Sequence, residues 1–200
     1  MNTILTMLLA FSMQLSPLCV PNFEVEQPEY VVKVMDDHGS FMFTGSGSLL
    51  REDIVLSCNH NIRDRTPGSL SVEFKDGTTR KAEVIRTNKK HDLSMLRIDP
   101  VDFEPVLPGL RAPKVGDFAK VCGFPKAGPY AEVSGTINGT LKQPKGFSVD
   151  EEVIQGMSGG PVLDKDGRQV GVVWGSTDED AYFTGFQTIL DFLVDDLDDD

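Results

Sequence analysis

The sequence predicts an all-β protein, and three observations lead to that class. Short runs of alternating or β-branched apolar residues recur along the whole chain. Nineteen glycines and twelve prolines are spread through the 200 residues and separate these runs. Helical spacing of apolar residues occurs in one stretch alone, close to the C-terminus. Many short strands joined by frequent turns are typical of a β-barrel or a β-sandwich.

The first half of the chain offers a strand between each pair of turn signals. A Lys-Asp-Gly turn at 75–77 lies between two alternating runs and predicts a hairpin. Residues 100–113 hold four prolines and one glycine, which predicts a linker or a long crossing loop between two halves. The predicted strands are 30–35, 41–50, 53–58, 69–74, 78–87 and 93–98.

The second half repeats this pattern and ends differently. Residues 187–197, QTILDFLVDDL, place Ile189, Leu190 and Leu193 on one side of a helix, which predicts a C-terminal amphipathic helix. The predicted strands are 117–124, 131–140, 147–150, 159–164, 170–175 and 181–187.

The formal charge of −12 excludes some classes of partner. Binding to nucleic acid or to an anionic membrane needs a basic surface, so neither is expected. The last six residues, DDLDDD, are expected to form a solvated acidic tail, because a block of like charges repels itself.

Three cysteines, Cys19, Cys58 and Cys122, are too few for a disulfide framework and include no CxxC pair. Cys58 and Cys122 lie in apolar runs and are expected to be small buried side chains.

Residues 1–20 begin with an uncharged segment whose apolar part, 4–11, is too short to span a bilayer. They are interpreted as a possible signal peptide, which places the protein in a secreted or periplasmic location; the alternative is an N-terminal arm.

The stretch QGMSGGPV, residues 155–162, surrounds Ser158 with glycines. Glycines at such density indicate unusual backbone dihedrals or the close approach of another molecule. A serine acts as a nucleophile when a base and an orienting acid stand beside it. His38 lies in a polar turn and is expected at the surface, whereas His60 follows a buried strand and Asp92 precedes one. From the residues alone, this triad is one of several possibilities.

Six segments of the chain, in one order, resemble the trypsin-like serine proteases, and among them the HtrA-like (Deg) branch. The likeness covers about residues 30–197. The segments are TGSGSLL, DIVLSCNHNI, VEFKDGTTRKAEVIRTNKKHDLSMLRI, VGDFAKVCGFP, GMSGGPVLDKDGRQVGVVWG and FTGFQTILDFL.

This resemblance implies two antiparallel six-stranded β-barrels with a short C-terminal helix and a site in the cleft between the barrels. The implied division is 21–105 for the N-terminal barrel and 106–200 for the C-terminal barrel with its helix and acidic tail. It assigns His60 as general base, Asp92 as its orienting acid and Ser158 as nucleophile. The N–H groups of Gly156 and Ser158 would form the oxyanion hole, and no metal or cofactor is expected.

The sequence departs from this family at three points. Cys58 and Asn59 replace the small or polar residues that are common before the histidine. Met157 stands where relatives carry Asn or Asp. Because Met does not form the hydrogen bonds of those side chains, the sequence does not establish whether the oxyanion hole is preorganised. Val173 and Trp174 occupy the region where many relatives have a hydroxyl that supports the triad acid; Ser176 or Thr177 could replace it.

The predicted substrate-binding residues are Glu152, Gln155, Trp174, Gly175 and Phe186. Glu152 either selects a basic side chain of the substrate or belongs to an exposed acidic loop.

The predicted function is a serine endopeptidase acting on a protein or peptide through an acyl-enzyme. The alternatives are a catalytically weak trypsin-like module that binds peptides or a protein partner, and a processing protease that cuts one site. The oligomeric state is left open.

Overall fold

The computed structural model describes residues 25–40, 42–62 and 68–194, and these fold into two closed barrels with one α-helix. The first barrel has the strand order β1-β2-β3-β6-β5-β4, with every neighbouring pair antiparallel. Its strands are β1 (Val31–Asp37), β2 (Met42–Arg51), β3 (Ile54–Ser57), β4 (Leu70–Glu73), β5 (Thr79–Asn88) and β6 (Leu93–Ile98).

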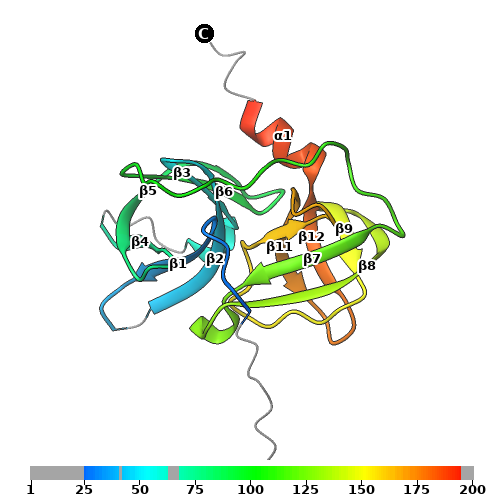
Figure 1. Ribbon diagram of the computed structural model, residues 1–200, viewed down its shortest axis with the longest axis horizontal. Coiled ribbons are helices and arrows are strands. Elements are labelled where there is room, and N and C mark those ends of the chain that lie inside the picture. Colours follow the sequence, from blue (N-terminus) through cyan, green and yellow to red (C-terminus); the bar gives the residue numbers. More distant parts are fainter. Residues whose placement is uncertain (1–24, 41, 63–67, 195–200) are drawn as a thin grey trace, which may run out of the picture.

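The second barrel has the order β10-β11-β12-β9-β8-β7 and is antiparallel throughout as well. Its strands are β7 (Phe118–Gly123), β8 (Ala131–Lys142), β9 (Lys145–Val149), β10 (Pro161–Leu163), β11 (Gln169–Ser176) and β12 (Ala181–Gly185). Figure 1 shows the two barrels side by side, with the green crossing segment joining β6 to β7. The prediction of two six-stranded antiparallel barrels is confirmed.

Alternation of apolar and polar residues places one face of each strand in a barrel core. In β4, Leu70 and Val72 are buried whereas Ser71 and Glu73 are half-buried, as a period of two requires. The first core centres on Leu49, Val55 and Leu96, each with no exposed surface. Burying a side chain of this size contributes about 1.5–3 kcal/mol. The core of the second barrel is built in the same way around Phe183 and Ile137.

The helix α1 (Phe186–Val194) closes a third apolar cluster that belongs to both barrels. Its Ile189 and Phe192 are buried with Leu56 from the first barrel and Val172 from the second. The helix therefore fastens the barrels together at one end of their interface. The predicted C-terminal helix is present and begins one residue earlier than expected.

Some expectations fall outside the described residues. These are the possible signal peptide at 1–20, Cys19, and the acidic tail at 195–200. Across the residues that are described, no helix has the length and apolar character needed to cross a membrane. Cys58 and Cys122 are fully buried free thiols, so that prediction is confirmed.

Candidate active site

Three segments from the two barrels bring the predicted triad residues into place. His60 lies in the short 3₁₀ turn η1 (Asn59–Asn61), which begins two residues after the end of β3. Asp92 lies in the turn before β6, and Ser158 lies in the loop between β9 and β10. The side chain of Asn61 donates a hydrogen bond of 2.8 Å to the carbonyl oxygen of Ser158. The histidine and serine segments, 97 residues apart in sequence, are thus in direct contact.

The His60 and Asp92 side chains form a hydrogen-bonded pair. His60 Nδ1 lies 2.5 Å from Asp92 Oδ2, and the His60 backbone N–H donates to Asp92 Oδ1 at 2.9 Å. Because both carboxylate oxygens are engaged by one residue, the carboxylate is fixed relative to the ring. An imidazole that donates from Nδ1 has Nε2 left as its acceptor. Because 43% of the His60 side chain is exposed, the ring is accessible from solvent.

The backbone at Asp92 adopts a left-handed conformation, with φ of 53°. Aspartate tolerates this region better than most residues, since its short side chain bonds locally. Its backbone carbonyl accepts a hydrogen bond from Asn59 N–H at 3.2 Å. The turn therefore binds the histidine segment through both its main chain and its carboxylate.

The loop that carries Ser158 has all of its carbonyl groups engaged. Each of the five carbonyls from Ile154 to Ser158 accepts at least one hydrogen bond from the protein. Within the loop, Met157 N–H donates to the Ile154 carbonyl (3.1 Å) and Gly160 N–H donates to the Met157 carbonyl (3.0 Å). From outside the loop, Lys126 N–H donates to the Gln155 carbonyl (2.6 Å) and Ser46 Oγ donates to the Gly156 carbonyl (2.8 Å). The Ser158 carbonyl accepts from both Ser46 N–H and Asn61 Nδ2 (2.8 Å each).

The N–H groups of this loop divide into two sets. Those of Met157, Gly159 and Gly160 donate to carbonyls of the protein. Those of Ile154, Gln155, Gly156 and Ser158 donate to no acceptor among the described residues. Ile154 and Gln155 are exposed, whereas Gly156 is buried and Ser158 is half-buried. Shielded N–H groups without an internal partner, here on two residues separated by Met157, are what a site for a developing oxyanion requires.

Two glycines of this loop have conformations that a side chain would not allow. Gly156 has φ of 102°, and a Cβ there would lie 2.5 Å from the carbonyl oxygen of Phe124. Gly159 has φ of 88°, and a Cβ there would lie 2.1 Å from the carbonyl oxygen of Ser46. Both glycines therefore serve backbone geometry and close approach: Gly156 to the segment that follows β7, and Gly159 to β2 of the first barrel.

Met157, which departs from the family pattern, packs in a core. Its side chain is 1% exposed and packs in the core of the second barrel with Val162 and Val173. The loop is therefore held by apolar packing at this position and by hydrogen bonds at its carbonyls, without a polar side chain at residue 157.

The Ser158 hydroxyl points at a neighbouring strand. Its Oγ donates a long hydrogen bond of 3.4 Å to the Trp174 carbonyl, and no hydrogen bond to His60 is present among the described residues. Ser176 donates to the Val153 carbonyl and Thr177 Oγ1 lies 3.5 Å from Tyr182 Oη. Neither hydroxyl reaches Asp92, so neither supplies the support that sequence reasoning left open.

Cys58 is the side chain that lies against the Asp92 carboxylate. Its sulfur and the ligand atoms of His60 and Asp92 all lie within 4.8 Å of one another, the one such group of potential metal ligands in the described ranges. The thiol donates to the Val173 carbonyl at 3.1 Å. Burial, and then the Asp92 charge, raise the pKa of this thiol well above its usual value. A protonated thiol is a poor ligand, and the His60–Asp92 pair is already closed, so the group suits a hydrogen-bonded dyad better than a metal ion.

The predicted substrate-binding residues lie in different environments. Gln155 and Glu152 are exposed on the loop before Ser158, whereas Val153 between them is buried in the core of the second barrel. Trp174 and Gly175 are half-buried on β11, and the Trp174 ring stacks on Tyr182 with centroids 5.5 Å apart.

Phe186 is half-buried and opens α1. Of the five residues, Gln155 and Trp174 are tied directly to the Ser158 loop, by chain neighbourhood and by the Ser158–Trp174 hydrogen bond.

Sequence reasoning missed Ser46, Asn61 and Lys126, which hold the carbonyls of this loop. Ser46 could have been suspected because it is a polar residue in the middle of an otherwise buried strand. Asn61 is adjacent to His60. Lys126 acts through its backbone N–H, which the sequence does not distinguish from any other.

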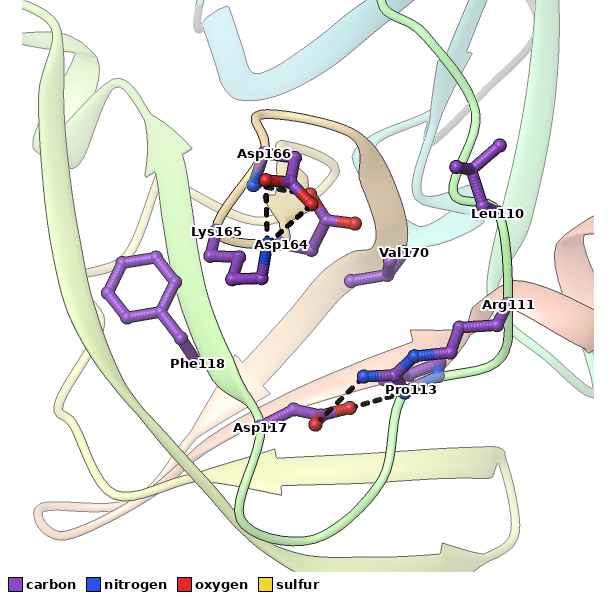
Figure 2. Close-up of a pocket in the computed structure, with 9 residues that line it drawn as sticks. All are labelled: Leu110, Arg111, Pro113, Asp117, Phe118, Asp164, Lys165, Asp166 and Val170. Atoms are coloured by element: carbon purple, nitrogen blue, oxygen red, sulfur yellow. Dashed lines mark hydrogen bonds and ion pairs between the residues drawn. The ribbon is translucent and has the colours of Figure 1, made fainter.

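A separate hollow of about 420 Å³ lies on the second barrel, and it contains none of the triad residues. Figure 2 shows Arg111 and Asp117 together at one edge of it, and hydrogen bonds of 2.7 and 3.0 Å join them. Leu110 and Phe118, both exposed, form part of its wall. It is therefore a surface feature distinct from the site at Ser158.

Comparison with known proteins places the chain in a family. Residues 45–172 match the family described as trypsin-like peptidase domain, which is more than half of the chain. Among curated proteins, a probable periplasmic serine endoprotease DegP-like from Bartonella henselae is 30% identical over 148 residues, covering 64% of this chain and 27% of that protein. Serine protease HTRA1B from Danio rerio is 28% identical over 142 residues, covering 64% of this chain and 29% of that protein. The chain thus spans about three tenths of the length of these relatives.

Solved structures agree on the fold. The serine endoprotease from Yersinia pestis superposes with a TM-score of 0.78 at 21% identity, covering 87% of this chain and 65% of that one. The active form of the Rv3671c protease from Mycobacterium tuberculosis gives 0.75 at 21% identity, covering 83% and 80%. With the family match over residues 45–172, the two barrels and the HtrA and DegP-like relatives, this chain belongs to the trypsin-like peptidase domain family.

Proposed function

We propose that this protein is a serine endopeptidase that hydrolyses peptide bonds through Ser158, His60 and Asp92. His60 Nε2 takes the hydroxyl proton while Ser158 Oγ attacks the scissile carbonyl carbon. The carbonyl oxygen becomes an oxyanion that accepts hydrogen bonds from Gly156 N–H and Ser158 N–H. Asp92 holds the Nδ1–H tautomer and stabilises the imidazolium.

The intermediate then collapses and the peptide C–N bond breaks. His60 returns its proton to the leaving amine, and the acyl group remains on Ser158 Oγ. A water molecule gives a proton to His60 and adds to the ester carbonyl in the same way. Collapse of the second intermediate releases the carboxylic acid and restores the serine.

One observation carries this proposal. In the loop 154–158 every carbonyl has a protein donor, whereas the N–H groups of Gly156 and Ser158 have no acceptor among the described residues. The N–H groups of Ile154 and Gln155 also lack an acceptor, but these two residues are exposed, whereas Gly156 is buried. A loop that served packing alone would have little reason to leave a donor open at a buried residue. Donors fixed before the reaction stabilise a developing charge without reorganisation.

One observation favours the second candidate, a catalytically weak module that binds peptides or a protein partner. Ser158 Oγ faces the Trp174 carbonyl at 3.4 Å instead of His60. Rotation of Ser158 about its Cα–Cβ bond moves the hydroxyl without disturbing the loop, and hydrogen bonds of catalytic groups commonly tighten when a substrate binds. The endopeptidase is therefore the preferred function.

The proposed substrate is a protein or peptide, bound beside Trp174 and Gly175 of β11. Glu152 and Gln155 are exposed at the approach to Ser158, so an effect of Glu152 on basic substrates would be exerted from the rim. The DegP-like relatives are described as periplasmic, and we propose the same kind of exported location. Cell fractionation of the full chain and of a form lacking residues 1–20 tests this; equal distribution of the two forms would contradict export through that segment.

The test of the activity is covalent labelling of the purified full chain with a fluorophosphonate probe. We expect intact-mass and peptide analysis to find one adduct at Ser158, and Ser158→Ala to remain unlabelled. Ser176→Ala is the matched control, because Ser176 is an exposed serine on the neighbouring strand. A folded protein that takes up no probe would favour the binding module.

Hydrolysis of casein separates a general endopeptidase from a processing protease. Labelling together with casein cleavage supports the general enzyme. Labelling without casein cleavage supports an enzyme that cuts one site.

A further inference from the structure

Ser46 joins the first barrel to the loop that carries Ser158. It lies on β2, and none of its surface is exposed. Its hydroxyl donates to the Gly156 carbonyl at 2.8 Å and accepts the backbone N–H of Phe124 at 2.9 Å. The hydroxyl therefore uses its one hydrogen and one lone pair on two different segments of the second barrel.

The backbone of Ser46 contacts the same loop a second time. Its N–H donates to the Ser158 carbonyl at 2.8 Å, and its own carbonyl accepts the Ser57 hydroxyl at 2.7 Å. One residue thus holds the carbonyl groups on both sides of Met157. A displacement of Ser46 would move the residues before and after Met157 together.

Gly156 is the residue whose orientation depends most on such contacts. Glycine has little intrinsic preference between peptide orientations, so the two peptide planes that flank it need external restraint. The plane before it is held by Lys126 N–H on the Gln155 carbonyl, and the plane after it is held by Ser46 Oγ. In a trans peptide the N–H points opposite to the C=O, so the carbonyl bound by Lys126 directs the Gly156 N–H to the opposite side.

We propose that the Ser46 hydroxyl is a positioning residue for the oxyanion site: by bridging Phe124 N–H and the Gly156 carbonyl, it fixes the peptide plane after Gly156. Together with Lys126, which fixes the plane before it, Ser46 holds Gly156 in the conformation that directs its N–H at the substrate oxygen. The inference rests on the proposed endopeptidase function. Ser46 does not touch the substrate and acts through Gly156. Its removal would leave the Gly156 carbonyl and the Phe124 N–H without their partner inside a buried interface.

The chain supplies a matched control two residues along the same strand. Ser48 is also completely buried, and its hydroxyl crosses the barrel interface to Gln169 Oε1 at 3.0 Å. Among the described residues, it forms no hydrogen bond with the loop 154–158. Ser46→Ala and Ser48→Ala each delete one buried interfacial hydroxyl, and they differ in whether that hydroxyl holds the oxyanion loop.

The experiment compares wild type, Ser46→Ala and Ser48→Ala as full chains. It measures the fluorophosphonate labelling rate constant, kcat and KM for p-nitrophenyl acetate, and the melting temperature. Loss of a whole oxyanion donor reduces kcat about 10²–10³-fold, so partial misorientation in Ser46→Ala should slow labelling and kcat at least about tenfold. KM should change little, because the contact matters in the transition state. Ser48→Ala should melt at a temperature lowered to a similar extent and react within about twofold of wild type.

Equal reactivity of the two variants, or a change confined to KM, would overturn the role of Ser46. Ser46→Cys decides the matter if Ser46→Ala does not fold, because a thiol nearly preserves the volume and is a weaker donor; a wild-type rate in that variant would overturn the role too. An unlabelled wild type beside an unlabelled Ser158→Ala would remove the proposed function itself, and the inference with it.

Discussion

Asn61 Nδ2 lies 2.8 Å from the carbonyl oxygen of Ser158 and 3.1 Å from the hydroxyl oxygen of Ser57. One amide group therefore binds the loop of the predicted nucleophile and the last residue of β3, which leads to the predicted base. The side chain fits against Gly45, where even a Cβ would lie 2.2 Å from Asn61 Nδ2. The distance between the two halves of the site is set by this buried amide as well as by the barrels.

Replacing Asn61 with Ala should destabilise the fold and slow labelling of Ser158. The change removes two buried hydrogen bonds, and each unsatisfied buried group costs about 1–3 kcal/mol. Urea denaturation measures the free energy of unfolding. Asn138→Ala is the control, because Asn138 bonds to Asp180 and Ser148 at the far side of the second barrel. Equal losses in the two variants would contradict a particular role for Asn61.

Replacing Asp92 with Asn should lower the labelling rate by a factor on the order of 10⁴, the size seen for this change in serine protease triads. The Asn amide can still accept the His60 backbone N–H, but its NH₂ group opposes the ring Nδ1–H and selects the wrong tautomer. The rate is measured by quenching the labelling reaction at successive times and determining the labelled fraction from the intact mass. A loss below tenfold would contradict the orienting role of Asp92.

The labelling rate should fall over a range of decreasing pH, because an imidazolium cannot accept the serine proton. The hydrogen bonds to Asp92 leave Nε2 as the sole acceptor of the ring. The measurement is the labelling rate constant across this range, beside the circular dichroism spectrum to verify folding. A constant rate in folded protein would exclude His60 as the base.

Asp117 should contribute stability that is lost in acid. Hydrogen bonds from Arg111, and then from Lys114 N–H, lower the pKa of Asp117 from 3.8 to about 2. Since the folded pKa lies below the unfolded one, the contribution is complete above the unfolded value and disappears as pH falls towards about 2.

Asp117→Asn should therefore be less stable than wild type at neutral pH, and the difference should shrink below about pH 4. Urea denaturation at stepped pH measures it. Asp166→Asn is the control, because the Lys165–Asp166 pair is largely exposed and such pairs contribute about 0–1 kcal/mol. A difference between Asp117→Asn and wild type that stayed constant with pH would contradict the ion pair with Arg111.

Cys58 and Cys122 should resist thiol reagents in the folded protein. Burial is the main cause that raises the pKa of Cys58 well above its usual value and that of Cys122 to about 11, so neither thiolate forms near pH 8. A Cys19→Ser variant isolates these two thiols. We expect almost no reaction with dithiobis(nitrobenzoate) in buffer and full reaction in guanidinium. Rapid reaction of the folded variant would contradict their burial.

The strands were predictable because their signals are local. Each of the twelve predicted segments overlaps one strand of the described structure, since alternating residues and turn glycines act over a few neighbours. The contacts that organise the site are not local. Ser46 and Gly156 are 110 residues apart, and no pattern near either residue indicates the other.

The assignment of His38 to the surface is wrong for a related reason. Its side chain is 10% exposed, and Nε2 lies 3.1 Å from a carboxylate oxygen of the buried Asp36. The turn is polar in sequence, but Asp36 points into the barrel and the edge of the His38 ring packs on Phe43, 6.0 Å between centroids. A run of polar residues predicts a turn, but it does not predict which side chains of that turn are buried. Burial of each side chain depends on its direction, which the preceding strand sets.

The two barrels contribute different parts of the contact that holds the Ser158 loop. The first barrel provides the Ser46 hydroxyl and the Asn61 amide, whereas the second provides the loop they hold. The segment 99–117 that joins them contains no strand. Cleavage there would place the Ser46 and Asn61 donors on one fragment and the loop that they hold on the other. If the proposed function is right, neither fragment alone should react with a fluorophosphonate, because the loop would be separated both from these donors and from His60.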